Sequence, residues 1–174
     1  MNKSLKEEET QESLREVQLV AFMLENEEFA VDIQKVREVL KMTRITPLPR
    51  SLEFVEGVIN LRGEIIPVVD LRKRFGLDDA QRDEDSRIII VEINQSDVGL
   101  VVDSVSEVVR LPEESIHGAP TGVAGARTDL IKSVGRKDDR LIIILDLDKI
   151  LSSEERISLE ELTLSEDQAN LGSA

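Results

Sequence analysis

The sequence repeats itself, and this repeat limits the possible folds more than any other feature of the chain. In a first alignment, Ile65–Lys73 matches Leu141–Lys149. A second alignment, at a slightly shorter offset, pairs Val36–Val39 with Val105–Val108 and Phe29–Val31 with Val98–Leu100. Residues 17–77 and 87–151 are therefore predicted to be two copies of one structural unit.

Each copy has the pattern of short strands. Val17–Leu24 is apolar on both faces, and Arg87–Ile93 is nearly continuously apolar, which is typical of strands covered on both sides. Gln34–Met42 has helical or irregular spacing instead. Turn residues recur about every 8–12 residues. The prediction is an all-β fold of two small pseudo-symmetric barrels packed together, with an exchange of strands between them left open.

The clearest local pattern runs from Gly57 to Gly76 as a strand, a tight turn, a second strand and one helical turn. Gly63 can adopt the positive φ that a hairpin turn requires. Pro67 has no N–H to donate, so it predicts an edge position or a bulge in the second strand. Asp70, and Asp146 at the equivalent place in the second copy, are predicted to cap short helices rather than to form paired catalytic carboxylates.

Composition excludes several classes of partner. The chain has a formal charge of −14, and its only aromatic residues are four phenylalanines. Phosphate binding needs a basic surface and base stacking needs aromatic side chains, so nucleic acid is excluded as a partner. The absence of cysteine suits a reducing cytosol and removes disulfides and most zinc sites. No signal peptide or membrane-spanning run is visible, which predicts a cytoplasmic protein without direct membrane insertion.

The two ends of the chain differ from its centre. Residues 1–16 are polar and charged, without a sustained apolar period, and are predicted to be a flexible N-terminal arm. Residues 152–174 carry a net charge of −5 and are predicted to be an acidic C-terminal helix and tail, because Glu154–Leu164 is compatible with a helix. The folded domain is therefore expected over residues 17–151.

No catalytic constellation is visible. His117 is the single histidine and is expected in a loop, where an exposed contact residue is favoured over a general base acting with Asp103 or Asp129. Asp138 and Asp139 lack metal-ligand spacing and predict a solvated turn. The sequence therefore predicts no catalytic residue, no cofactor and no metal site.

Two lone charges and two apolar strands are harder to interpret. Glu38 and Arg62 each lie in an apolar neighbourhood; mutual pairing and simple outward orientation are about equally open, although an unpaired buried charge would be costly. The apolar strands Phe29–Ile33 and Val98–Val102 could line a groove between the lobes that receives a helix, or could simply fill the core between them.

Residues 57–72, with the sequence GVINLRGEIIPVVDLR, closely resemble the signature of the bacterial chemotaxis coupling proteins, the CheW family. The similarity extends to Phe29–Val39, Val98–Val108 and Leu141–Leu151, and covers about residues 17–151. It implies two intertwined five-stranded SH3-like β-barrels without enzymatic activity. It also implies a cytoplasmic adaptor, recruited to membrane-associated receptor arrays, that couples chemoreceptor tips to the histidine kinase CheA through its regulatory domain.

The resemblance also implies roles for individual residues. The positions that match the inter-barrel groove for the receptor tip are Ile33, Val36, Gly99, Val101 and Val105. The positions that match the kinase-facing end of one barrel are Thr46, Pro47, Leu48, Pro49, Phe54, Val55 and Gly57. Glu38 and Arg62 match a pair that locks the lobes, which favours mutual pairing, and His117 and Val123 match a second, weaker array contact.

Two alternatives remain open beside the adaptor. The first is an isolated CheW-like regulatory module that serves another kinase pathway. The second is a β-barrel enzyme that uses His117. A stand-alone adaptor is favoured over a fusion, because the length leaves no room for an ATP-binding domain or a receiver domain of about 120 residues.

Overall fold

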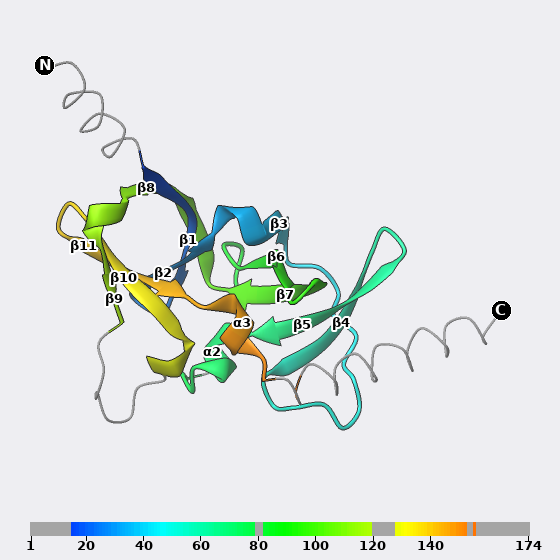
Figure 1. Cartoon of the computed structure of the whole chain (residues 1–174). Coiled ribbons are helices and arrows are strands. Elements are labelled where there is room, and N and C mark those ends of the chain that lie inside the picture. The colour runs from blue at the N-terminus through cyan, green and yellow to red at the C-terminus, as the bar shows by residue number, and fades with distance from the viewer. Residues whose placement is uncertain (1–14, 79–81, 120–127, 153–154, 156–174) are drawn as a thin grey trace, which may run out of the picture.

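The computed structural model describes residues 15–78, 82–119, 128–152 and 155, which form two packed β-sheets (Figure 1). The first sheet has the order β8-β1-β2-β11-β10-β9, with β1 at Glu16–Leu24, β2 at Glu27–Asp32, β8 at Ser104–Pro112, β9 at Ile116–Gly118, β10 at Ile131–Lys137 and β11 at Arg140–Leu145. The second has the order β3-β6-β7-β5-β4, with β3 at Val36–Lys41, β4 at Val55–Leu61, β5 at Glu64–Asp70, β6 at Arg87–Ile93 and β7 at Ser96–Val102.

Each sheet takes strands from both copies of the repeat, so the two barrels are intertwined. Strands β1 and β2 come from the first copy but pair with β8 and β11, while β6 and β7 come from the second copy but pair with β3 and β5. The register repeats as well, since Val68 pairs with Gly99 in one sheet and Ile144 pairs with Ala30 in the other. The predicted fold is confirmed, and the first sheet has one short additional strand, β9.

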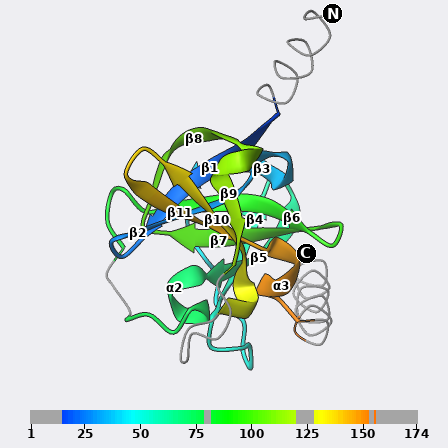
Figure 2. The ribbon, with the colours of Figure 1, turned by 60° about the vertical axis from the view of Figure 1, so that its left-hand side comes forward.

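The described helices are short. They are the 3₁₀ helices η1 at Ile33–Lys35, η2 at Glu113–Ser115 and η3 at Thr128–Leu130, and the α-helices α2 at Leu71–Arg74 and α3 at Leu147–Ile150. Asp70 caps α2 by accepting from the N–H groups of Arg72 and Lys73, and Asp146 caps α3 by accepting from that of Asp148. The predicted capping roles are confirmed. Figure 2 shows α2 and α3 together at the lower end of the molecule, with β1 and β8 at the upper end.

The second sheet closes into a barrel through the connector between β3 and β4. Thr46 and Val58 exchange two backbone hydrogen bonds of 2.8 Å, which joins the chain after β3 to the opposite edge strand. Gly57, beside this bridge, has a φ of +142°, and a Cβ there would overlap the carbonyl oxygen of Thr46 and stand 2.9 Å from the Cα of Pro47. Only glycine fits this closure without moving the backbone.

Three apolar clusters hold the molecule together. The largest lies between the sheets and joins Phe22 and Leu24 of β1 to Ile89 of β6 and Leu100 of β7. Two smaller clusters lie within single sheets, one around Leu19 and the other beneath β5 and β6. The strand residues 29–31 and 98–102 are buried in these clusters, so they fill the core rather than line an open groove.

Two local features differ from the sequence pattern. Gln34–Met42 is η1 followed by a strand, and its irregular spacing reflects a register shift between Val36 and Glu38 opposite β6. Pro67 lies in β5, which has neighbours on both sides, rather than on an edge strand. The pairing of β5 with β7 begins at Val68, so Pro67, which has no N–H to donate, stands just outside that ladder.

Several predicted features fall outside the described residues. Of the predicted N-terminal arm, only Arg15 and Glu16 are described, and Glu16 already belongs to β1. Of the predicted C-terminal helix and tail, only Ser152 and Glu155 are described. Val123, predicted as an array contact, also lies outside the described residues.

Candidate interaction surfaces

The chain passes between the sheets at two equivalent crossovers. The first is η1, between β2 of one sheet and β3 of the other, where the Asp32 carboxylate accepts a hydrogen bond of 2.9 Å from the N–H of Gln34. The second is Asp103, between β7 and β8. Ile33 and Val36 therefore lie at the first crossover, and Val105 lies just after the second.

These three apolar residues share one environment. Ile33, Val36 and Val105 are each partly exposed, and each packs against the cluster between the sheets. Three of the five predicted receptor-groove residues therefore lie at the margin of the inter-sheet core.

The other two residues of that predicted set are buried. Val101 is 5% exposed and belongs to a core cluster of the second sheet. Gly99 is also buried, and a Cβ on it would lie 2.9 Å from a methyl carbon of Ile88. Direct contact of these two positions with the receptor stays a prediction, because their burial in the free protein does not test it.

Glu38 and Arg62 form an ion pair with 2.8 Å between Oε2 and Nη2. Glu38 lies on β3, and Arg62 lies in the turn between β4 and β5, so the pair spans the two edges of a single sheet. The pair does not join the two lobes, which corrects that expectation. The Arg62 side chain is 71% exposed, and the hydrogen bond to Glu38 raises the pKa of its guanidinium.

This turn has the backbone that the sequence predicts. Gly63 has a φ of +88°, as expected, and Arg62 itself has a φ of +51°. The side-chain oxygen of Asn60 accepts a hydrogen bond of 2.9 Å from the Gly63 N–H. The turn thus holds Arg62 over a cavity of about 310 Å³ that Arg37 and Asp97 also line.

The second barrel repeats this ion pair, which the sequence analysis missed. Glu107 of β8 stands at the position equivalent to Glu38, and its Oε1 lies 3.1 Å from Nη2 of Arg140 in β11. Arg140 also lies 3.4 Å from Glu28 of β2. The second alignment of the two copies makes Glu107 equivalent to Glu38 and could have indicated it. The first alignment does not make Arg140 equivalent to Arg62, so it gave no sign of the arginine partner.

Some of the predicted kinase-facing residues are exposed, and the others are buried or partly buried. Thr46, Pro47 and Pro49 are exposed on the connector. Leu48, Val55 and Gly57 are buried beneath them, and Phe54 is partly exposed. The connector therefore presents a short proline-bearing ridge that its own buried residues anchor to β4.

Arg74 of α2 joins this region to the C-terminal end of the domain, and no sequence pattern indicated it. Its guanidinium lies over the ring of Phe54, 4.6 Å from the centroid, and its Nε donates to the carbonyl oxygen of Ile150 at 2.7 Å. Its Nη2 lies 3.2 Å from Glu155. Ser152 and Glu155 exchange hydrogen bonds as in a capping box, a signature of a helix start.

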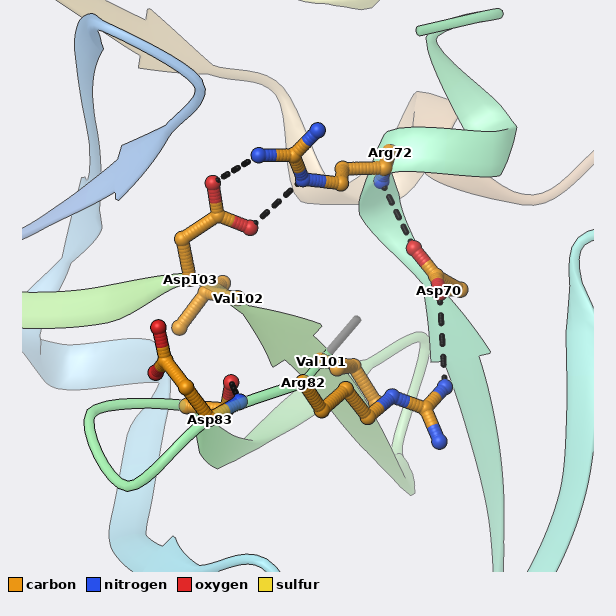
Figure 3. A pocket seen from close by; sticks show the side chains of 8 residues that line it. Asp70, Arg72, Arg82, Asp83, Val101, Val102 and Asp103 are labelled. Carbon is orange, nitrogen blue, oxygen red and sulfur yellow. Dashed lines mark hydrogen bonds and ion pairs between the residues drawn. The ribbon is translucent and has the colours of Figure 1, made fainter. Parts of the chain in front are cut away.

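A second arginine of α2 reaches the β7–β8 crossover (Figure 3). Arg72 donates to the two carboxylate oxygens of Asp103 at 2.7 and 2.5 Å. The hydrogen bond to Asp103 raises the pKa of the Arg72 guanidinium, whose side chain is 15% exposed. The pair borders a cavity of about 130 Å³, which Asp70, Arg82 and Asp83 also line. Because Arg72 and Asp103 lie far apart in the chain, their contact has no sequence signature.

A network of charges surrounds the start of α2. Glu56 of β4 lies 2.7 Å from Lys73 and 2.9 Å from Arg82, and Arg82 also lies 3.3 Å from Asp70. Burial alone would raise the pKa of the Glu56 carboxyl, but the hydrogen bonds from Lys73 and Arg82 outweigh it and the pKa is lowered. The network fixes α2, and with it both arginines described above, against the second sheet.

His117 and Asp103, which the sequence analysis weighed as a catalytic pair, lie on different parts of the described structure. His117 is exposed on β9, opposite Val134, and its imidazole makes no hydrogen bond within the described part of the chain. Asp103 is held by Arg72 on another part of the fold. Across the described residues, no cluster of three or more acidic, histidine or cysteine side chains could hold a metal ion. The described helices are also all too short or too polar to cross a membrane.

Comparison with known proteins settles the family. The CheW-like domain profile matches residues 18–155. The chain belongs to the CheW family. It is 37% identical to the chemotaxis protein CheW of Thermotoga maritima, covering 89% of this chain and 95% of that protein. It is 36% identical to the chemotaxis protein CheW of Klebsiella aerogenes, covering 85% of this chain and 89% of that protein.

A solved structure agrees with this assignment. The crystal structure of the scaffolding protein TtCheW from Thermoanaerobacter tengcongensis superposes with a TM-score of 0.76 at 42% identity, covering 81% of this chain and 96% of that one. This CheW-family chain is therefore a chemotaxis scaffold and not an enzyme.

Proposed function

We propose that this protein couples the cytoplasmic tips of chemoreceptors to the histidine kinase CheA at membrane-associated receptor arrays. The observation that carries the proposal is its membership of a family of chemotaxis scaffolds, over most of its length. A scaffold needs at least two separate surfaces, one for each partner. We assign one surface to each partner, and the geometry described above supports this assignment.

The receptor surface is the margin of the inter-sheet core at the two crossovers. Ile33, Val36 and Val105 are partly exposed there and are backed by buried apolar residues. An amphipathic helix binds such a margin by laying its apolar stripe against the exposed parts of these side chains. Glu38 and Arg62 stand on the same sheet as Val36 and supply polar groups beside it.

The kinase surface is the connector ridge of Thr46, Pro47 and Pro49, together with the partly exposed ring of Phe54. Prolines lose little conformational entropy on binding, so a ridge of this kind is pre-organised for a partner. His117 on β9 belongs to the other sheet and is assigned to a separate, weaker contact between array components.

Binding to each partner separately tests this division. Val36→Lys should weaken binding to a chemoreceptor tip and leave binding to the CheA regulatory domain unchanged, while Pro49→Glu should do the reverse. Val39→Lys is the matched control for the first variant, because Val39 lies on the same strand and is 41% exposed. Equal effects of Val36→Lys and Val39→Lys on receptor binding would contradict the assignment of the receptor surface. Binding of the wild-type protein to another histidine kinase, and not to CheA, would favour a regulatory module of a different pathway.

A further inference from the structure

The two crossovers between the sheets are held in different ways. At the second crossover, the Asp103 carboxylate receives both hydrogen bonds from Arg72 and a third, of 2.8 Å, from the backbone N–H of Glu25. The backbone N–H of Asp103 itself donates to the carbonyl oxygen of Met23 at 3.1 Å. Glu25 lies in the turn between β1 and β2 of the first sheet, whereas Arg72 belongs to α2, which follows β5 of the second. The Asp103 carboxylate therefore joins the two sheets, and the Glu25 carboxylate adds to this contact, since its Oε1 lies 3.8 Å from Nη1 of Arg72.

The first crossover has no equivalent of this contact. The repeat shows which residues would form an equivalent contact. Extending the second alignment makes Gln34 equivalent to Asp103, and the first alignment makes Asp148 equivalent to Arg72. Gln34 is exposed, and no hydrogen bond joins its side chain to Asp148 within the described part of the chain. The pseudo-symmetry of the fold is therefore broken at this point, with one crossover tied across the sheets by a bidentate ion pair and the other not.

Arg72 is itself held in place. Its Nη1 donates to the carbonyl oxygen of Asp78 at 2.9 Å, and its backbone N–H donates to the Asp70 carboxylate. The bidentate arrangement fixes the direction of the guanidinium plane as well as its distance, and a lysine could not reproduce it. The contact is therefore suited to setting the angle between the sheets as well as holding them together.

We propose that Asp103 and Arg72 act as a positioning latch that sets the relative orientation of the two sheets, and thereby the shape of the receptor surface. Val105 follows shortly after Asp103 and pairs with Phe22 of the inter-sheet core. Ile33 and Val36 lie at the crossover without the latch. A change in the angle between the sheets would move these residues relative to Val105. The effect on the receptor surface rests on the proposed function, whereas the effect on orientation does not.

The orientation can be measured directly, because the chain has no cysteine and accepts spin labels at chosen sites. Labels at Lys41 of β3 and Arg136 of β10 report the distance between the sheets, and labels at Arg110 of β8 and Arg136 report a distance within one sheet. All three residues are exposed. In Asp103→Asn, the Lys41–Arg136 distance distribution should shift or broaden, and the Arg110–Arg136 distribution should stay unchanged.

Binding provides the second readout. Asp103→Asn should weaken binding to a receptor tip by roughly tenfold, the scale usual for coupling between sites. Its binding to the CheA regulatory domain should stay within about twofold, because the connector ridge is a separate surface. Glu107→Gln, which breaks the ion pair with Arg140 within a single sheet, is the matched control and should change neither readout. Should Asp103→Asn fail to fold, Arg72→Lys replaces it with the same expected results.

The outcomes separate the latch from the proposed function. An unchanged Lys41–Arg136 distribution in a folded latch variant would overturn the proposal. So would a shifted distribution with receptor binding equal to that of the wild type. If the wild-type protein binds no receptor tip, the proposed function is wrong, and the distance distributions alone decide whether the latch sets the orientation.

Discussion

The carbonyl oxygen of Thr46 occupies the space into which any side chain on Gly57 would point. A Cβ at residue 57 would overlap this oxygen. The contact lies beside the Thr46–Val58 bridge that closes the second sheet into a barrel. One glycine therefore allows both the barrel closure and the connector ridge that we assign to the kinase.

Gly57→Ala should be strongly destabilising. The alanine combines a φ of +142° with a clash against backbone, and we expect it to cost roughly 3 kcal/mol or more of the free energy of unfolding. Gly63→Ala is the matched control, since Gly63 has a φ of +88° with no heavy atom within 4 Å, and it should cost only about 1 kcal/mol. Urea denaturation of both variants checks this. If both variants lost the same free energy of unfolding, the connector would be able to move away from β4, and the account of Gly57 would be wrong.

Arg62→Ala should impair coupling without destabilising the protein. The side chain is 71% exposed, and exposed ion pairs contribute little to stability. Thermal melting should therefore hardly change, while receptor-dependent kinase activity falls. Glu38→Gln should behave in the same way, and the double variant should be no worse than either single one. A large drop in melting temperature would instead mean that the Glu38–Arg62 pair stabilises the fold by joining the two edges of the second sheet.

Glu56 should make stability depend on pH in the acid range. Its folded-state pKa is lowered below the ordinary value of 4.5, because Lys73 and Arg82 outweigh the effect of burial. A lowered folded-state pKa means that the unfolded chain binds the proton more tightly, so the stabilisation is present above about pH 4.5 and is lost as the pH falls through the lower folded value. Glu56→Gln should thus be less stable than the wild type at neutral pH, and the difference should narrow below pH 4.5.

Denaturation curves between neutral pH and about pH 3 measure this difference. In an Arg82→Met background, the contribution of Glu56 should shrink, because one of its two cationic partners is missing. A stability difference between Glu56→Gln and the wild type that stays constant over the whole range would contradict the assigned pKa shift.

Arg74 should matter more than a surface arginine. It contacts the Phe54 ring, the Ile150 carbonyl and the Glu155 carboxylate, and its side chain is only 11% exposed. We expect Arg74→Met to cost roughly 2 kcal/mol of the free energy of unfolding. Arg74→Lys should recover only part of the loss, since a lysine keeps the charge but not the planar fork. Full recovery by lysine would reduce the role of Arg74 to that of a simple point charge.

The local patterns predicted the strands, turns and caps because these depend on residues close together in the chain, and the repeat predicted two copies of one β unit. The exchange of strands between the barrels was implied only by the family resemblance. The two alignments of the repeat correctly identified β5 and β11, and β3 and β8, as equivalent strands of the two copies. Gly63 and Asp70 correctly marked a turn and a helix cap. Their roles follow from backbone conformation alone.

The parts of the site that the sequence did not predict depend on how the strands are exchanged. Burial of Val101 follows from β7 leaving its own copy to join the other sheet. The Asp103–Arg72 latch joins residues that meet only at a crossover, and Arg74 of α2 meets Phe54 only through the folding of the chain, 20 residues away. Glu38 and Arg62 matched a known pair, but the sequence could not show that both lie on one sheet.

The central claim is that this protein links two partners, and receptor-dependent kinase activity measures the link directly. Membranes that contain a chemoreceptor are sedimented with the protein and CheA, in all combinations, and kinase phosphorylation is followed in parallel. Our account predicts that CheA sediments with the membranes, and that its phosphorylation is stimulated, only when all three components are present. Sedimentation and stimulation that are the same without this protein would contradict the proposed coupling.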